Sequence, residues 1–216
     1  MCAALFTTSF RQLCFAVVLI LGAAAAGIIQ AQAIELTPPQ ADLYNSVSIL
    51  PPTSDRMPVC YGFGCRRRTY LDFTDGDRRT LTKIIAAGKA SPGAERAAIQ
   101  KAVIWFDKRM GPLIGTDKRV ANADIRAGAD ATNYDCWDTT RNAASLLLVL
   151  QEWKLFKHHT VGNPRYRGNF LVGQLPHNTA VIVDKTSGIE WVVDMWPKSY
   201  AQPPDVMPAD QWQAER

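Results

Sequence analysis

The stretch that most constrains the fold is DCWDTTRNAASLLLVL, residues 135–150. Between Ala143 and Leu150 it leaves almost no polar face at helical spacing, and a helix of that kind has to be buried on most of its sides. Asp135 can cap the helix, and Asp138 lies three residues further on, at capping-box spacing. Any fold of this chain must therefore enclose the helix, and Cys136 stands in its first turn.

A thiol at the start of a helix has a chemical consequence. The positive partial charge of a helix N-terminus stabilises a thiolate, so Cys136 can act as a nucleophile. The carboxylates of Asp135 and Asp138 oppose this effect, since nearby negative charge raises the pKa of a thiol. Such a thiol needs a base, although a lone buried cysteine is more often an inert apolar side chain.

The composition is that of an ordinary globular domain. The chain has 216 residues, of which 47% are hydrophobic and 20% charged, and its formal net charge is only +4. The run Arg66–Arg68 and the pair Arg78 and Arg79 are typical of a solvated surface, so we expect no nucleic-acid partner.

The N-terminal region predicts export. Arg11 precedes an apolar run, Leu13–Ile29, and the triplet Ala31-Gln32-Ala33 follows it, which together resemble a signal peptide cleaved after Ala33. The run is close to the lower length limit for crossing a bilayer, so an uncleaved membrane anchor is the alternative. We expect a periplasmic or secreted protein that meets a membrane only through this segment if it stays uncleaved.

The expected export bears on the remaining cysteines, because disulfides form in oxidising compartments. Without the leader the chain keeps Cys60, Cys65 and Cys136, an odd number that leaves at least one unpaired. Cys60 and Cys65 enclose a short glycine-containing loop, and a local disulfide is the favoured interpretation. Half of a zinc site is the alternative, but a second ligand pair at the right spacing is missing, so we predict no metal.

The chain divides into three predicted regions: the signal peptide at residues 1–33, a proline-rich extended or irregular arm at 34–58, and one domain at 59–216. Within the domain the first predicted helix covers residues 77–87. A second starts at Ser91-Pro92, and Gly111-Pro112 is expected to end it.

The C-terminal part reads as β structure. Residues 111–132 and the basic segment 162–168 are expected to be loops, and KHHTV, residues 157–161, begins a strand. Two runs rich in Val, Ile and Trp within residues 179–196 flank a turn at 184–188, which indicates a β-hairpin. Helices followed by an antiparallel sheet make an α+β fold.

The hairpin brings a histidine and an aspartate together. His177 stands at the start of the first strand and Asp194 on the returning one. A symmetric turn pairs residues whose numbers sum to about 372, to within one residue of register, which places His177 opposite Met195, with Asp194 adjacent. The carboxylate can then orient the imidazole, which makes His177 the candidate base for Cys136.

The segments DCWDTTRNAASLL, PHNTAVI and VDMW resemble exported bacterial proteins of the transglutaminase-like branch of the papain-like cysteine enzymes. The resemblance covers roughly residues 59–212. It implies a papain/transglutaminase-like fold, with a buried central helix packed on an antiparallel sheet. It also implies a Cys136 nucleophile, a His177 base and an Asp194 orienting group. The chain departs from the family in Asn178-Thr179, where an aromatic pair commonly follows the histidine.

The implied chemistry is acyl transfer through a thioester, on a protein, peptide or cell-wall peptide substrate. Water would make the protein a peptidase or amidase, and an amine would make it a transglutaminase. Backbone N–H groups at the helix start, including that of Cys136, could hold the oxyanion, with Asn133 or Trp137 as side-chain donors. No nucleotide or EF-hand motif is present, so we predict no cofactor.

Two alternatives stay open. A papain-like peptidoglycan endopeptidase also begins a helix with Asp-Cys, but it usually carries a second histidine or polar residue where this chain has Asp194. A non-catalytic envelope binding or scaffold protein could keep the fold and lack turnover. His158 and His159 should point to opposite faces of a strand, so structural roles are expected for both.

Overall fold

The computed structural model describes residues 33–123, 126, 129–169, 171 and 173–215. The chain divides into two units, residues 1–30 and residues 31–216, and all the described residues belong to the second. The predicted signal peptide lies outside the described residues apart from Ala33. Among the helices that are described, none combines the length and the apolar character needed to cross a membrane.

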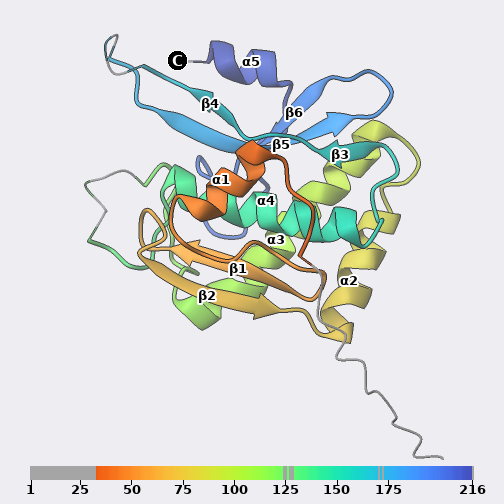
Figure 1. Ribbon diagram of the computed structural model, residues 1–216, viewed down its shortest axis with the longest axis horizontal. Coiled ribbons are helices and arrows are strands. Elements are labelled where there is room, and N and C mark those ends of the chain that lie inside the picture. Colours follow the sequence, from red (N-terminus) through yellow and green to blue (C-terminus); the bar gives the residue numbers. More distant parts are fainter. Residues whose placement is uncertain (1–32, 124–125, 127–128, 170, 172, 216) are drawn as a thin grey trace, which may run out of the picture. The chain divides into compact units, whose positions relative to one another are not determined.

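The second unit is a mixed α+β structure built around helix α4 (Cys136–Glu152). This helix packs against strand β1 (Arg56–Tyr61) on one side and strand β5 (His177–Asp184) on the other (Figure 1). Every residue of α4 from Asp138 to Leu150 is buried. The predicted burial of this helix is confirmed, because apolar side chains on all its faces find partners in both sheets.

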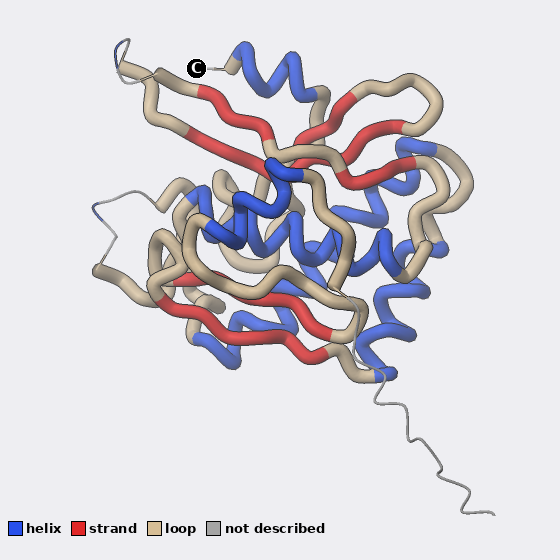
Figure 2. The backbone as a smooth tube through the Cα atoms, viewed as in Figure 1, coloured by secondary structure: helices blue, strands red, loops and turns tan. Residues whose placement is uncertain are grey.

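Figure 2 shows the strands in red, and they form two antiparallel sheets. The first pairs β1 with β2 (Arg67–Asp72). In the second, β5 pairs with β3 (His159–Val161), β4 (Arg165–Arg167) and β6 (Glu190–Val193). The other described helices are α1 (Pro38–Asn45), α2 (Asp75–Ala86), α3 (Pro92–Ile114) and α5 (Ala209–Ala214).

The segment 34–58 is not the extended or irregular arm that its prolines indicate, since it contains helix α1. Pro38 occupies the first turn, where its missing N–H costs nothing. Thr37 and Gln40 form a reciprocal capping box. The helix then buries Leu43 and Tyr44 in the core, which is tertiary stabilisation that a local pattern does not reveal.

The expected order of helices first and sheet second is also wrong, because the β1–β2 hairpin precedes α2 and α3. Its strands flank the loop between Cys60 and Cys65. The segment 162–168, expected to be a loop, contains strand β4, which pairs with the start of β5. Strand β4 is only three residues long and depends on its pairing with β5, so no local pattern reveals it.

Helix α3 continues past Gly111-Pro112, where the sequence indicated its end. A proline removes one backbone hydrogen bond, and near the C-terminus of a helix few such bonds follow it. Gly111 lies against Tyr200, and a Cβ atom there would come within 2.5 Å of the Tyr200 ring. This close approach explains a glycine inside the helix, which ends instead at Gly115 in the left-handed conformation (φ 77°).

Candidate active site

Cys136 is the first residue of α4, the position that the sequence indicated. Asp135 caps the helix: its side chain accepts the backbone N–H of Asp138, and the side chain of Asp138 accepts the N–H of Asp135. The thiol is half-buried and unpaired. The backbone N–H of Asn178, the residue after His177, lies close enough to the thiol to lower its pKa. The thiol therefore lies beside the backbone at the start of β5.

The surroundings of Cys136 favour the protonated thiol. Burial, together with the negative charges of Asp135 and Asp194, raises its pKa to about 11. The backbone N–H groups of Asn178 and of Cys136 itself act in the opposite direction but do not outweigh burial. At neutral pH the resting side chain is therefore a thiol, and a base must remove its proton before it can attack a substrate.

His177 and Asp194 are in direct contact: Nε2 of the imidazole lies 2.6 Å from Oδ2 of the carboxylate, and both residues are buried. The other ring nitrogen, Nδ1, is also buried and has no hydrogen-bond partner within the described residues. The ring is therefore not hydrogen-bonded to the thiol in this structure. A carboxylate on one nitrogen and an open second nitrogen is the arrangement that a general base needs.

The contact depends on a register that differs from the predicted one. In the structure Ala180 pairs with Val193, so residue numbers sum to 373 and not to 372. Continued to the strand ends, this register places Asp194 opposite Thr179, on the same face as His177. The predicted register would have put the two side chains on opposite faces, because one step along a strand reverses the side.

The start of α4 is held by the loop that the predicted disulfide closes. Cys60 and Cys65 are bonded, which confirms that prediction. Residues Gly62 to Cys65 all have positive φ, so two residues other than glycine adopt the left-handed conformation. The N–H groups of Phe63 and Cys65 donate to the carboxylate of Asp138 at 2.8 and 2.6 Å.

The same loop reaches the cap residue, since the N–H of Gly64 donates to Asp135 at 2.7 Å. Burial, assisted by the nearby charge of Asp135, raises the pKa of Asp138 to about 7. Two carboxylates thus join the disulfide loop to the first turn of α4. The sequence indicated Asp135 and Asp138 only as helix-cap residues, and the structure shows that they also anchor this loop.

The two side chains proposed as oxyanion donors have different surroundings. The amide of Asn133 is engaged elsewhere: its Oδ1 accepts the N–H of Val120 at 2.9 Å and its Nδ2 donates to Asp130 at 2.7 Å. The ring of Trp137 is partly exposed and lies 5.7 Å, between centroids, from that of Tyr166 on β4. Trp137 is therefore the better placed of the two to meet a substrate.

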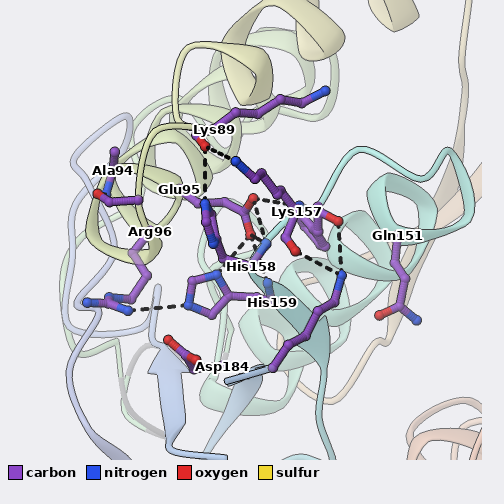
Figure 3. Close-up of polar contacts among 12 residues, drawn as sticks. Lys89, Ala94, Glu95, Arg96, Gln151, Lys157, His158, His159 and Asp184 are labelled. Carbon is purple, nitrogen blue, oxygen red and sulfur yellow. Dashed lines mark hydrogen bonds and ion pairs between the residues drawn. The ribbon is translucent and has the colours of Figure 1, made fainter. Parts of the chain in front are cut away.

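His158 and His159 belong to a separate polar cluster around Glu95, a buried residue in the first turn of α3 (Figure 3). The Glu95 carboxylate accepts the backbone N–H groups of Lys157, His158 and His159, and it contacts Nδ1 of His159 at 2.9 Å. Nε2 of His159 lies 3.3 Å from Nη1 of Arg96. Both histidines thus join β3 to α3.

Sequence reasoning missed Asn178 and Trp212. Asn178 places its backbone N–H near the thiol, and because every residue except proline has such a group, the residue type does not reveal this contact. Trp212, on α5, donates its indole N–H to Asp194 from a position 18 residues away in the chain. An aromatic residue in a short C-terminal helix gives no local signal of such a role. In the part of the chain that is described, no cluster of three or more His, Cys, Asp or Glu has the geometry of a metal site.

Comparison of the chain with protein-family models, with curated proteins and with solved structures finds no match in any of the three. Support for a function therefore comes from the geometry of this chain and from the resemblance of its three segments.

Proposed function

We propose that this chain is an exported cysteine acyl-transfer enzyme that acts on amide bonds, with the papain/transglutaminase-like fold that its motifs resemble. Cys136 is the nucleophile, His177 the base and Asp194 the group that orients the base. One observation carries the proposal: a buried imidazole has one nitrogen against a carboxylate and the other open, and the backbone N–H of the next residue lies near a helix-start thiol.

The reaction begins with the proton of the Cys136 thiol passing to Nδ1 of His177, because a thiol with a pKa of about 11 carries its proton at rest. Sγ attacks the amide carbonyl carbon, and the carbonyl π electrons move onto its oxygen. As they return, the C–N bond breaks and the imidazolium of His177 gives its proton to the departing amine. The product is a thioester on Cys136.

A second nucleophile then resolves the thioester. Water or an amine gives a proton to His177 and attacks the same carbonyl carbon, and the C–S bond breaks. The sulfur recovers its proton, and the acyl group leaves as an acid or as a new amide. The backbone N–H of Cys136 and the indole N–H of Trp137 are the oxyanion donors we propose.

Thiol labelling tests the assignment without knowledge of the substrate. We expect iodoacetamide to modify the folded protein at Cys136, as located by peptide mass spectrometry, and His177→Ala to slow this reaction at pH 7 by about 100-fold. Cys136→Ala identifies the labelled site. Equal labelling rates in wild type and His177→Ala would refute the role of the imidazole.

The fate of the acyl group distinguishes the two reaction types. A glutamine-containing protein such as casein is incubated with the enzyme and a fluorescent primary amine. Incorporation of the fluorophore indicates transamidation, whereas new peptide termini or free ammonia without incorporation indicate hydrolysis. Cys136→Ala should abolish whichever product the wild type forms.

A non-catalytic binding protein is the second candidate, and the high pKa of Cys136 favours it. A thiol that stays protonated near neutral pH behaves as a small buried side chain unless a base acts on it. On this alternative, Cys136→Ala would leave every function of the protein intact.

A further inference from the structure

The C-terminal helix α5 packs against β4 and β6 (Figure 1). Its residue Trp212 is 1% exposed. The indole Nε1 donates to Oδ2 of Asp194 at 2.9 Å, and this is the same oxygen that contacts Nε2 of His177. The rings of Trp212 and His177 also lie against each other, with their centroids 5.3 Å apart.

Strand β4 holds Trp212 in place. Arg167 is the register partner of His177 in the β4–β5 pairing, so the two residues sit side by side on adjacent strands. The guanidinium of Arg167 lies 4.3 Å from the centroid of the Trp212 ring, and its Nη1 donates to the carbonyl oxygen of Trp212 and to Glu215. The helix is thereby fixed to the strand that borders the imidazole.

The chemistry of the three groups determines where the imidazole proton lies. An indole N–H can only donate, and an ionised carboxylate can only accept. When Asp194 is ionised, its Oδ2 accepts from both rings, so the proton of a neutral His177 ring sits on Nε2 and the lone pair is on Nδ1. The other carboxylate oxygen accepts the backbone N–H of Trp196 at 3.1 Å. With donors on both oxygens, the plane of the carboxylate cannot rotate.

We propose that Trp212 is a positioning residue, which holds the Asp194 carboxylate so that His177 keeps its basic nitrogen, Nδ1, open toward the thiol. The inference rests on the proposed function, since it gives the imidazole the role of base. It assigns a part in that site to a helix that contributes no group to the reaction itself.

The test is the pH dependence of Cys136 alkylation by iodoacetamide, measured on the full chain. Trp212→Phe removes the indole N–H and keeps an aromatic ring of similar position. Trp105→Phe is the matched control, because Trp105, in α3, stacks on Phe73 and contributes no group to the site. His177→Ala tests the proposed function in the same assay.

We expect Trp212→Phe to slow alkylation at pH 7 by about 10-fold, the effect of losing one hydrogen bond to a charged group. Without the indole donor more of the negative charge of Asp194 acts on the imidazole, so the protonated ring is favoured and the base-dependent rise in rate moves to higher pH. Loss of packing alone would not move that midpoint. Trp105→Phe should match the wild type in both respects.

The outcomes separate the two proposals. If His177→Ala is slow but Trp212→Phe keeps the wild-type rate and midpoint, the role of Trp212 is wrong and the proposed function stands. If His177→Ala reacts as fast as wild type, the proposed function itself fails. A slow His177→Ala together with a shifted Trp212→Phe profile supports both.

A measurement on the unmodified protein covers the case in which Trp212→Phe does not fold. Nitrogen-15 chemical shifts of His177 distinguish the two neutral tautomers. We expect the ring to be protonated on Nε2 in the wild type at a pH where it is neutral. A majority of the Nδ1–H tautomer would overturn the proposal, because the basic nitrogen would then face Asp194 and not the thiol.

Discussion

Two buried contacts between a histidine and a carboxylate occur among the described residues. They differ in whether the second ring nitrogen has a partner. In one, Nε2 of His177 contacts Asp194, and Nδ1 has no hydrogen-bond partner in the described part of the chain. In the other, Nδ1 of His159 contacts Glu95, and Nε2 lies beside Arg96. Both histidines are almost entirely shielded from solvent.

On the proposed function, this difference separates the reactive histidine from a structural one. With a carboxylate on one nitrogen and a guanidinium on the other, the ring of His159 has no free position from which to take a proton. Glu95 also accepts three backbone N–H groups, which fits a role in joining β3 to α3 (Figure 3). His177, with its open nitrogen, directly precedes Asn178, whose backbone N–H lies near the thiol of Cys136, the only unpaired cysteine among the described residues. A histidine–carboxylate pair is thus informative about catalysis only when the partner of the other ring nitrogen, the one that does not contact the carboxylate, is known.

The largest expected effect is on the stability of the protein, at the His159–Glu95 pair, where both ring nitrogens have a neighbour. Glu95→Ala should lower the free energy of unfolding by about 3 to 5 kcal/mol, because it leaves the buried ring and N–H of His159, and two partly buried N–H groups, without their acceptor. Urea denaturation measures this change. The alkylation rate of Cys136 in the protein that remains folded should equal that of wild type, and a slower rate would mean that the two pairs are coupled.

The corresponding change at the His177–Asp194 pair, replacement of its carboxylate, should alter the reactivity of Cys136. Asp194→Ala should slow alkylation of Cys136 at pH 7 by about 100-fold, since the imidazole loses the group that fixes its tautomer and orientation. The measurement is the second-order rate constant with iodoacetamide. If Asp194→Ala alkylates at the wild-type rate, then Asp194 is a structural carboxylate like Glu95 and the contrast between the two pairs disappears.

A smaller effect is expected where the disulfide loop meets α4. Replacing Cys60 and Cys65 together by serine should lower the free energy of unfolding by about 2 kcal/mol, the value for closing a loop of this short length. Thermal denaturation under non-reducing conditions measures it. Amide hydrogen exchange should increase at Phe63 and at position 65 but not at His159, because the loop anchors α4 and the Glu95 cluster joins α3 to β3. Uniform exchange at all three would contradict a local role.

The smallest effect is a pH dependence of opposite sign for two buried carboxyl groups. Burial raises the pKa of Asp138 to about 7, so the folded state binds its proton more tightly and stability falls by about 1.4 kcal/mol between pH 6 and pH 8. Burial also opposes ionisation of Glu95, but hydrogen bonds from His159 and from backbone N–H groups lower its pKa on balance. The ionised Glu95 therefore stabilises the folded state. This stabilisation is fully present above the pKa that Glu95 has in the unfolded chain, and it is lost as the pH falls through the pKa in the folded state.

Chemical denaturation across this pH range, compared between wild type and Asp138→Asn, isolates the first effect. The asparagine variant should lack the decrease between pH 6 and pH 8, because it has no proton to lose. A decrease of the same size in both proteins would assign it to another group.

The hairpin shows how far sequence reasoning reaches. The alternation of Val, Ile and Trp predicted both of its strands, and the turn at residues 184–188 predicted their antiparallel pairing. The register was wrong by one residue, since a turn of this length allows more than one closure and packing against α4 and α5 selects among them. That single step decides whether His177 and Asp194 share a face.

The sequence alone determined that residues 136–150 form a buried helix, that Cys136 stands at its start, and that a strand hairpin carries His177 and Asp194, because these depend on local periodicity and capping. Only the tertiary structure decided the hairpin register, the seating of the disulfide loop on Asp135 and Asp138, and the place of Trp212 beside Asp194. Those contacts join segments far apart in the chain, and their energy comes from burial and from pairing of polar groups that no local pattern records.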